Sequence, residues 1–230
     1  VGDEYFNVYY PKLVKILLEH QELLARQRAY RLRPQDLLAT CALEVFARWN
    51  RAHRAGGGQK IGLWLPVNIR RHPSEGFGNG TSRIRLYARY KSNASFVEKC
   101  REVRRQVAWT SKHGEWVVPE ILYFTRLPRP IIGPLLRGYL RLPAVDMATG
   151  VFSHAGSWIA NAGEAFKHVE RIECVGLLHP RQSVAVNAAT HGGQTWLSIT
   201  YDPELFNAAE AQQLAQMYEQ QIAHAREELL

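Results

Sequence analysis

An arginine and an asparagine that follow an apolar run are the residues of this sequence best placed for chemistry. Arg70 stands just after the run Ile61–Val67. A planar guanidinium in such a position can hold and orient a carboxylate through two hydrogen bonds. The alternative for Arg70 is a solvated strand end or a local ion pair with Glu75. Asn79 lies between two glycines, a composition that is also typical of a tight turn with positive φ.

The sequence holds no complete catalytic motif. It contains no Gly-x-Ser-x-Gly elbow, phosphate loop, dinucleotide fingerprint or His-x-x-x-His spacing. His191 precedes two glycines, with no Asp three residues later, and is interpreted as a turn residue; His179 before Pro180 is interpreted as a loop residue. We therefore predict no catalytic residue and no metal site within this chain, and a self-contained hydrolase or kinase is disfavoured.

The elements that would position these residues follow from the hydrophobic spacing. Leucines at intervals near 3.6 predict a helix over Tyr5–Tyr30, and Pro34 suits the first turn of a second, deeply packed helix over Gln35–His53. The strand Ile61–Val67 has almost no polar interruption, so we expect it at the centre of a sheet. The next predicted elements are a strand over Ser82–Tyr90, a helix over Ser95–Trp109 capped by Asn93 or Ser95, and short helices over 118–145.

The C-terminal part predicts strands and a last helix. A strand is expected over Val151–Ala160, and two alternating segments, Ser183–Thr190 and Trp196–Tyr201, flank a Gly-Gly turn and predict a hairpin. The last helix is expected over Asn207–Glu228. Together these elements predict an α/β fold with a mixed β-sheet flanked by helices.

Composition favours an ordinary globular protein. The 230 residues are 46% hydrophobic and 22% charged, and we expect one domain over 1–230, with a leading helix over 1–32 and a sheet-and-helix core over 33–230. Three widely spaced cysteines (Cys41, Cys100 and Cys174) form no Cys-x-x-Cys pair, so we expect reduced thiols and a cytoplasmic location.

The positive charge raises the question of the partner. The formal net charge is +8 and the pI about 9.6, but the basic residues are scattered and no nucleic-acid-binding motif appears, so no nucleic acid is expected. Positive potential would instead attract an acidic carrier protein or a CoA phosphate, and the alternative is that the arginines solvate helix faces. The stretch Leu127–Pro143 is either a lid with membrane-surface contact or a Pro-rich connection packed on the core.

Several short motifs, in their order, resemble one family. They are Leu63-Trp-Leu-Pro-Val-Asn-Ile-Arg70, Gly76-Phe-Gly-Asn79-Gly, Phe152-Ser-His-Ala-Gly156, the segment Gly192–Asp202 and the helix Leu205–Leu230. This layout resembles the C-terminal half of the condensation-domain-like, or chloramphenicol acetyltransferase-like (CAT-like), acyltransferases. That group includes nonribosomal peptide condensation domains and wax-ester and diacylglycerol synthases. The resemblance covers the chain from about Arg33 to its end.

The resemblance implies a fold and a function. The chain would be one lobe of a CAT-like enzyme that moves an acyl group from a CoA or carrier-protein thioester to a hydroxyl or amine. In that family the first half carries His-His-x-x-x-Asp-Gly, whose second His is the general base, and this motif is absent here. The expected partners are therefore the missing N-terminal lobe and an acyl carrier protein or CoA, and no bound cofactor is expected.

The same resemblance implies roles for four residues. Arg70 would pair with the Asp of the absent motif, and Asn79 would shape a turn beside the substrate tunnel. Ser153 and His154 would lie on a strand that faces the tunnel, with His154 where Asn is common in the family. The alternative for Ser153 and His154 is a strand with one polar surface.

Two other functions remain open from the sequence. The chain could be a non-catalytic relative of the fold that binds a carrier or ligand, which predicts an upstream lobe without the His. It could also be an unrelated basic module that binds nucleic acid or an anionic membrane, which predicts steeply salt-dependent binding.

Overall fold

A computed structural model describes the central sheet and the helices that pack on it. The described residues are 12–19, 30–53, 60–68, 81–89, 94–113, 128, 130–135, 148–157, 168–170, 172–176, 178, 184–191 and 194–229. The strands are β1 (Lys12–Glu19), β2 (Lys60–Asn68), β3 (Thr81–Arg89), β4 (Gly150–Ser157), β5 (Val184–His191) and β6 (Gln194–Tyr201). The long helices are α2 (Pro34–His53), α3 (Phe96–His113) and α6 (Ala208–Leu229), and residues 130–135 form a short helix.

The strands form one mixed sheet, as the sequence predicts. Their order is β1-β6-β5-β4-β2-β3, with β4 parallel to both β2 and β5 and every other pair antiparallel. Strand β2 lies inside the sheet between β4 and β3, which agrees with its continuous apolar sequence. The pairing of β2 with β4 is short and joins only Leu63 to Gly150 and Trp64 to Val151.

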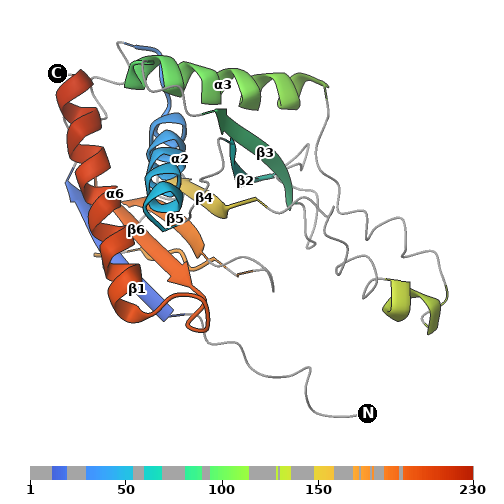
Figure 1. Ribbon diagram of the computed structural model, residues 1–230. Coiled ribbons are helices and arrows are strands. Elements are labelled where there is room, and N and C mark those ends of the chain that lie inside the picture. The colour runs from blue at the N-terminus through green and yellow to red at the C-terminus, as the bar shows by residue number, and fades with distance from the viewer. Residues whose placement is uncertain are drawn as a thin grey trace.

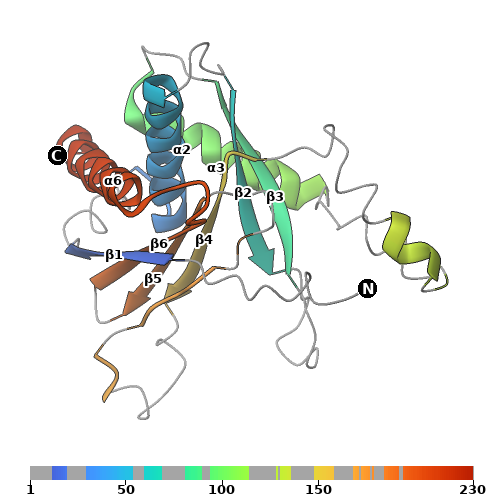
Figure 2. The same ribbon diagram turned by 60° about the horizontal axis from the view of Figure 1, so that its bottom comes forward.

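The three long helices cover one face of the sheet, and α2 lies between the other two (Figure 1). Figure 2 shows the same helices gathered on one side of the strands. The core lies between these two layers because alternate strand residues point toward the helices. The buried strand residues on this face include Leu63, Leu65, Ile84, Leu86, Phe152, Val186, Leu197 and Ile199.

Helix α2 is buried along most of its length and approaches β4 closely. Gly150 lies beneath the ring of Phe46, where an added Cβ would sit 2.8 Å from two ring atoms. Helix α2 also contacts α6, where the Tyr218 hydroxyl donates to the carbonyl of Leu38 in α2. A glycine in the strand therefore sets how near α2 can come to the sheet.

Helices α3 and α6 begin at reciprocal caps. The backbone N–H of Glu98 donates to Ser95 Oγ (3.3 Å), and the Ser95 N–H donates to Glu98 Oε2 (2.9 Å). Asn207 and Glu210 make the same exchange at 2.9 and 2.8 Å. Each pair satisfies N–H groups that the first turn of a helix leaves free. Of the two predicted caps for α3, the structure selects Ser95.

The leading helix predicted over 1–32 is wrong where the structure describes it. Residues Lys12–Glu19 form β1, which pairs antiparallel with β6 from Lys12–Tyr201 to Glu19–Gln194. Leu13, Leu17 and Leu18 fit a helical spacing, but the β-branched Val14 and Ile16 between them fit a strand equally well. Pairing with an open sheet edge satisfies the backbone of this segment and overrides the local preference.

The other predicted long helices and strands agree with the described residues apart from their ends, and of the short helices predicted over 118–145 the structure describes one, at residues 130–135. The hairpin strands β5 and β6 are in register from Val184–Tyr201 to His191–Gln194. Of the three cysteines, Cys41 and Cys100 are buried in the core, Cys174 is half-buried, and all are free thiols. No helix in the described part of the chain has the length and apolar character needed to span a bilayer.

Candidate functional site

The carboxyl ends of the parallel strands β2, β4 and β5 point to the same edge of the sheet. Open α/β sheets bind their ligands at this kind of edge. Strand β2 ends there at Asn68, and β4 continues past its short pairing with β2 to Ser157. Of the four predicted site residues, Ser153 and His154 lie on this part of β4. Arg70 and Asn79 lie outside the described residues.

Ser153 and His154 point to opposite faces of the sheet. Ser153 is in register with Asn187, and His154 is in register with Ala188. Ala188 belongs to the core beneath the helices, so His154 lies on the helix-covered face. Ser153 and Asn187 lie on the other face. The two side chains therefore belong to different faces of the sheet, and that this strand faces a tunnel stays a prediction.

His154 is a half-buried imidazole that lacks a hydrogen-bond partner within the described residues. Its Nε2 atom is inaccessible to solvent and has no such partner there. Burial lowers the pKa of His154 from the ordinary value of 6.5, because a charged ring would lose its hydration. The ring is therefore neutral at pH 7 and presents unused hydrogen-bonding capacity.

A β-bulge follows His154 directly. The register of β4 with β5 shifts between His154 and Ser157, and Gly156 within this interval has a φ of 72°. Positive φ favours glycine, and a bulge locally re-aims the side chains of its strand. The glycine of the Ser-His-Ala-Gly motif thus has a backbone role at the end of β4.

The helix-free face carries a polar row that begins at Ser153. Asn187 of β5 is next to Ser153, and Ser198 of β6 is next to Asn187. Asn187 is 1% exposed, and its Nδ2 donates to Thr200 Oγ1 at 3.4 Å. Buried polar side chains of this kind are rare unless the structure pairs them. Asn187 and Ser198 were not singled out from the sequence, although both are polar residues within the strands of the predicted hairpin.

Residues 168–170 and 172–176 lie over this polar row. Ser198 Oγ donates to the carbonyl of Cys174, and the His191 ring donates from Nε2 to the carbonyl of Val169. At Gly176 the backbone comes so close that an added Cβ would lie 2.4 Å from Asn187 Oδ1. His191 therefore ends β5 and anchors this segment through its ring.

Over β2 and β3 the same face carries a tryptophan whose ring contacts two arginines. The guanidinium carbons of Arg83 and Arg85 lie 4.1 and 4.5 Å from the centroid of the Trp64 ring, within the range of a cation–π contact. Arg85 Nη1 also donates to the Tyr87 hydroxyl at 2.9 Å. Trp64 is 4% exposed as a result. On this face of the sheet, the arginine side chains therefore cover the tryptophan ring.

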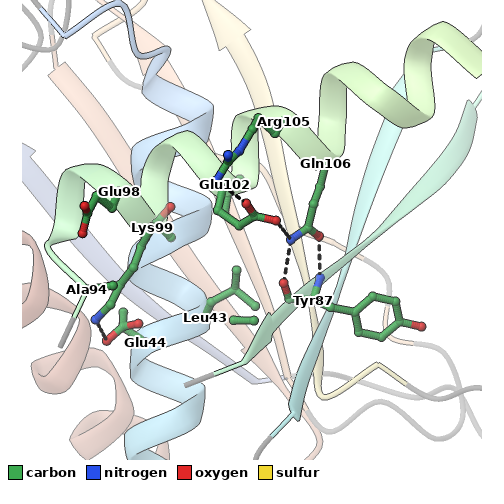
Figure 3. A pocket seen from close by; sticks show the side chains of 12 residues that line it. Leu43, Glu44, Tyr87, Ala94, Glu98, Lys99, Glu102, Arg105 and Gln106 are labelled. Carbon is green, nitrogen blue, oxygen red and sulfur yellow. Dashed lines mark hydrogen bonds and ion pairs between the residues drawn. The ribbon is translucent and has the colours of Figure 1, made fainter. Parts of the chain in front are cut away.

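On the helix side, a pocket of about 600 Å³ lies between α2, α3 and β3 (Figure 3). Its polar groups pair with each other across it. Lys99 Nζ lies 3.0 Å from Glu44 Oε2, and Gln106 both donates to Tyr87 O (2.8 Å) and accepts from Tyr87 N (2.9 Å). These contacts fasten α3 to α2 and to the outer edge of β3. The described residues that line the pocket include no nucleophile–base pair.

The described residues also lack a metal centre. No group of three or more His, Cys, Asp or Glu side chains that could hold an ion occurs among them. The chemistry that the described site can offer is hydrogen bonding from His154 on one face of β4 and from the polar row on the other.

The comparisons with known proteins identify the fold. No protein-family model and no curated protein matches the sequence. Solved structures do match. The epimerization domain from the third module of tyrocidine synthetase B matches with a TM-score of 0.61 and 14% identity, over 96% of this chain and 49% of that chain. The condensation domain of the enacyloxin polyketide synthase, described for chain release, matches with a TM-score of 0.61 and 13% identity, over 94% and 41%. The fold is that of half a condensation domain.

A third match comes from outside those synthetase domains. Polyketide synthase associated protein 5 from Mycobacterium tuberculosis has a TM-score of 0.58 and 12% identity, over 92% of this chain and 50% of that chain. All three matches cover nearly the whole chain and at most half of the other protein. The predicted resemblance to a condensation-domain-like lobe is therefore confirmed at the level of the fold.

Proposed function

We propose that this chain is the C-terminal lobe of a condensation-domain-like acyltransferase. The whole protein would move an acyl group from a CoA or carrier-protein thioester to a hydroxyl or amine acceptor. The observation that carries this proposal is the fit of nearly the entire chain to about half of a condensation domain. We expect the protein in the cytoplasm.

The proposed reaction needs one base and a cavity between two lobes. The acceptor oxygen or nitrogen forms a bond to the thioester carbonyl carbon, the carbon–sulfur bond breaks, and the thiol leaves. A base must take the acceptor proton. We assign that base to a histidine of the other lobe, since this sequence contains no His-His-x-x-x-Asp-Gly motif. This chain would supply a wall of the cavity.

Within this chain, Arg70 and His154 have different proposed roles. Arg70 would hold the carboxylate of the catalytic motif and so orient the base without touching the acyl group. The neutral His154 ring, with its unused Nε2 among the described residues, would donate to or accept from a substrate. Asn79 and Ser153 would support the cavity wall as turn and strand residues.

The experiment is a transfer assay on a protein that contains both lobes. Acyl-pantetheine thioesters would be supplied with hydroxyl and amine acceptors, and thiol release would be followed together with product mass. We expect Arg70→Ala to lower kcat by about 100-fold, because a misplaced base loses most of its advantage. Arg70→Lys keeps the positive charge but loses the paired N–H donors of the guanidinium, so it should recover only part of the activity.

A matched control separates this role from general charge. Arg226→Ala removes an exposed arginine of α6 and should leave kcat within about twofold, as exposed charges contribute little. Equal activity of Arg70→Ala and the parent protein would remove the assigned role. An upstream lobe without the His motif, together with thioester binding but no turnover, would replace the acyltransferase by a non-catalytic binding protein.

One of the matched structures is described as an epimerization domain, so the assay must distinguish two reactions on the same fold. A chiral acyl thioester serves for this. Transfer yields a new ester or amide and free thiol, whereas epimerization leaves the thioester intact and changes only its stereochemistry. We expect the first outcome.

A further inference from the structure

Helix α3 has one face in the core and the opposite face in solvent. Its buried residues are Phe96, Cys100, Val103 and Thr110. Opposite them, Arg101, Arg105, Ala108 and Lys112 are exposed and recur at intervals of three, four and seven residues, so they share one side of the helix. We call these four residues, with Arg104 and Trp109 at their margins, the α3 basic face. Figure 1 shows α3 at the rim of the molecule, across one end of α2.

The α3 basic face combines cationic groups with an exposed aromatic ring. Arg101, Arg104 and Arg105 line a shallow concavity together with Glu98 and Ala108. Trp109 is 52% exposed, one of the most exposed large hydrophobic side chains in the described part of the chain. Arginine and tryptophan are the residues that most often anchor protein–protein interfaces. One side of the Trp109 ring packs on the His113 ring, with 4.7 Å between the ring centroids, and about half of its surface remains accessible to a partner.

The acidic residues beside this face limit its partner. Glu98 and Glu102 are exposed along one margin, and Arg105 Nη2 already lies 2.6 Å from Glu102 Oε2. On the other margin, burial raises the pKa of the Asp36 carboxyl, and the positive charge of Arg104 opposes that rise. The positive field is therefore local and interrupted. A nucleic-acid surface needs a longer array of phosphate contacts to hold its affinity at physiological salt.

We infer that the α3 basic face docks an acidic α-helix of a partner protein. Arg101 and Lys112 are eleven residues apart, which corresponds to about 16 Å, or three turns of a facing helix. Carboxylates on one side of that helix would meet Arg101, Arg105 and Lys112, and an apolar side chain would pack on Trp109. This inference does not rest on the proposed acyl transfer.

The test is an NMR titration of the ¹⁵N-labelled chain at 150 mM NaCl. The probe is an 18-residue helical peptide with Glu along one side and one Leu, compared with the same peptide carrying Gln in place of Glu. We expect saturable shifts of the Trp109 indole N–H and of the α3 amides with the Glu peptide. Binding of the Gln peptide should be about tenfold weaker. Trp109→Phe assigns the indole signal.

Charge reversal with a matched control completes the test. R101E/R105E should weaken binding of the Glu peptide by about tenfold. R51E/R226E makes the same change of net charge on exposed positions of α2 and α6 and should change binding by less than about twofold. Circular dichroism checks that both variants keep the helical content of the parent.

Three outcomes would overturn the inference. The first is the absence of saturable shifts on α3, or shifts located elsewhere. The second is equal weakening by the control pair, which would show a response to net charge alone. The third is equally tight binding, at the same salt, of a single-stranded oligonucleotide of equal charge or of vesicles with anionic lipid, which would assign the face to nucleic acid or to a membrane.

Discussion

At the scale of single residues, the neutral state of His154 ties stability to pH. Burial lowers its pKa in the folded chain below the ordinary 6.5, whereas the unfolded chain retains the ordinary value. Between these two values the unfolded state binds more protons. The contribution of His154 is therefore fully present above about pH 6.5 and is lost as the pH falls toward the folded pKa.

We therefore expect His154→Gln to flatten the pH dependence of stability. Urea unfolding at pH 7.5 and 5.5 should show a smaller loss on acidification for this variant than for the parent. His168, which is exposed, provides the control, and His168→Gln should follow the parent. An NMR titration that finds the His154 ring charged at pH 7 would contradict the assignment.

Gly176 is a second residue whose identity should affect stability, because its backbone packs directly against Asn187. An added Cβ would lie 2.4 Å from Asn187 Oδ1, so Gly176→Ala should cost about 1–3 kcal/mol of unfolding free energy, as overpacking usually does. The measurement is denaturant unfolding. In the double variant with Asn187→Ala the clash is gone, and the combined loss should be smaller than the sum of the two single losses. Strict additivity would place the strain elsewhere.

At the scale of elements, Gln106 of α3 protects the outer edge of β3. Its amide both donates to and accepts from the backbone of Tyr87, as another strand would. A free strand edge invites unwanted pairing with other chains. These two hydrogen bonds help to hold α3 at the edge of the sheet, since only four residues of this helix are buried.

We expect Gln106→Ala to expose that edge. The Tyr87 amide should exchange with solvent faster, and the stability should fall by about 1 kcal/mol for the lost hydrogen bonds. Gln106→Glu keeps an acceptor for the Tyr87 N–H and should preserve more of its protection. Hydrogen exchange followed by NMR reports on this single amide. Unchanged exchange in Gln106→Ala would show that the bond is not closed in solution.

Element type was predictable wherever one periodicity excluded the other. The broad apolar face of Pro34–His53 fits only a helix, and Ile61–Val67 is too short and continuous for anything but a buried strand. Lys12–Glu19 fits the period of a helix and that of a strand, and it forms a strand because it pairs with the edge of β6. A local pattern cannot report the presence of a distant edge.

The candidate site was predictable only in its position along the chain. The motif around Ser153 and His154 was located correctly on a strand, but the two side chains take opposite faces. The polar row through Asn187 and Ser198 depends on which strands are neighbours, and its cover by residues 172–176 depends on a backbone contact at Gly176. Both features follow from the topology of the sheet, which the identity of single residues does not reveal.

At the scale of the whole molecule, the proposed two-lobe acyltransferase predicts that the stability of this chain depends on the other lobe. A lobe that fits another lobe is stabilised by it through mass action. We expect the chain, mixed with a separately expressed N-terminal lobe, to unfold at a Tm that rises with the concentration of that lobe. At 100 times Kd the gain would be about 2.7 kcal/mol. An unchanged Tm at concentrations up to about 100 µM would argue against a separable partner lobe. The R51E/R226E variant serves as a control for unspecific charge effects.

The uneven burial of the three cysteines has a practical consequence. Cys41 and Cys100 are fully enclosed between α2 and α3, and burial raises the pKa of Cys100 to about 12 and that of Cys41 well above its usual value. Since only a thiolate reacts with a maleimide, both should resist alkylation while the chain is folded. Half-buried Cys174, whose pKa burial also raises, should react slowly but first, as peptide mass mapping can verify. A fluorophore attached there would sit on residues 172–176, above Ser198, and would report directly when anything lifts these residues from the sheet.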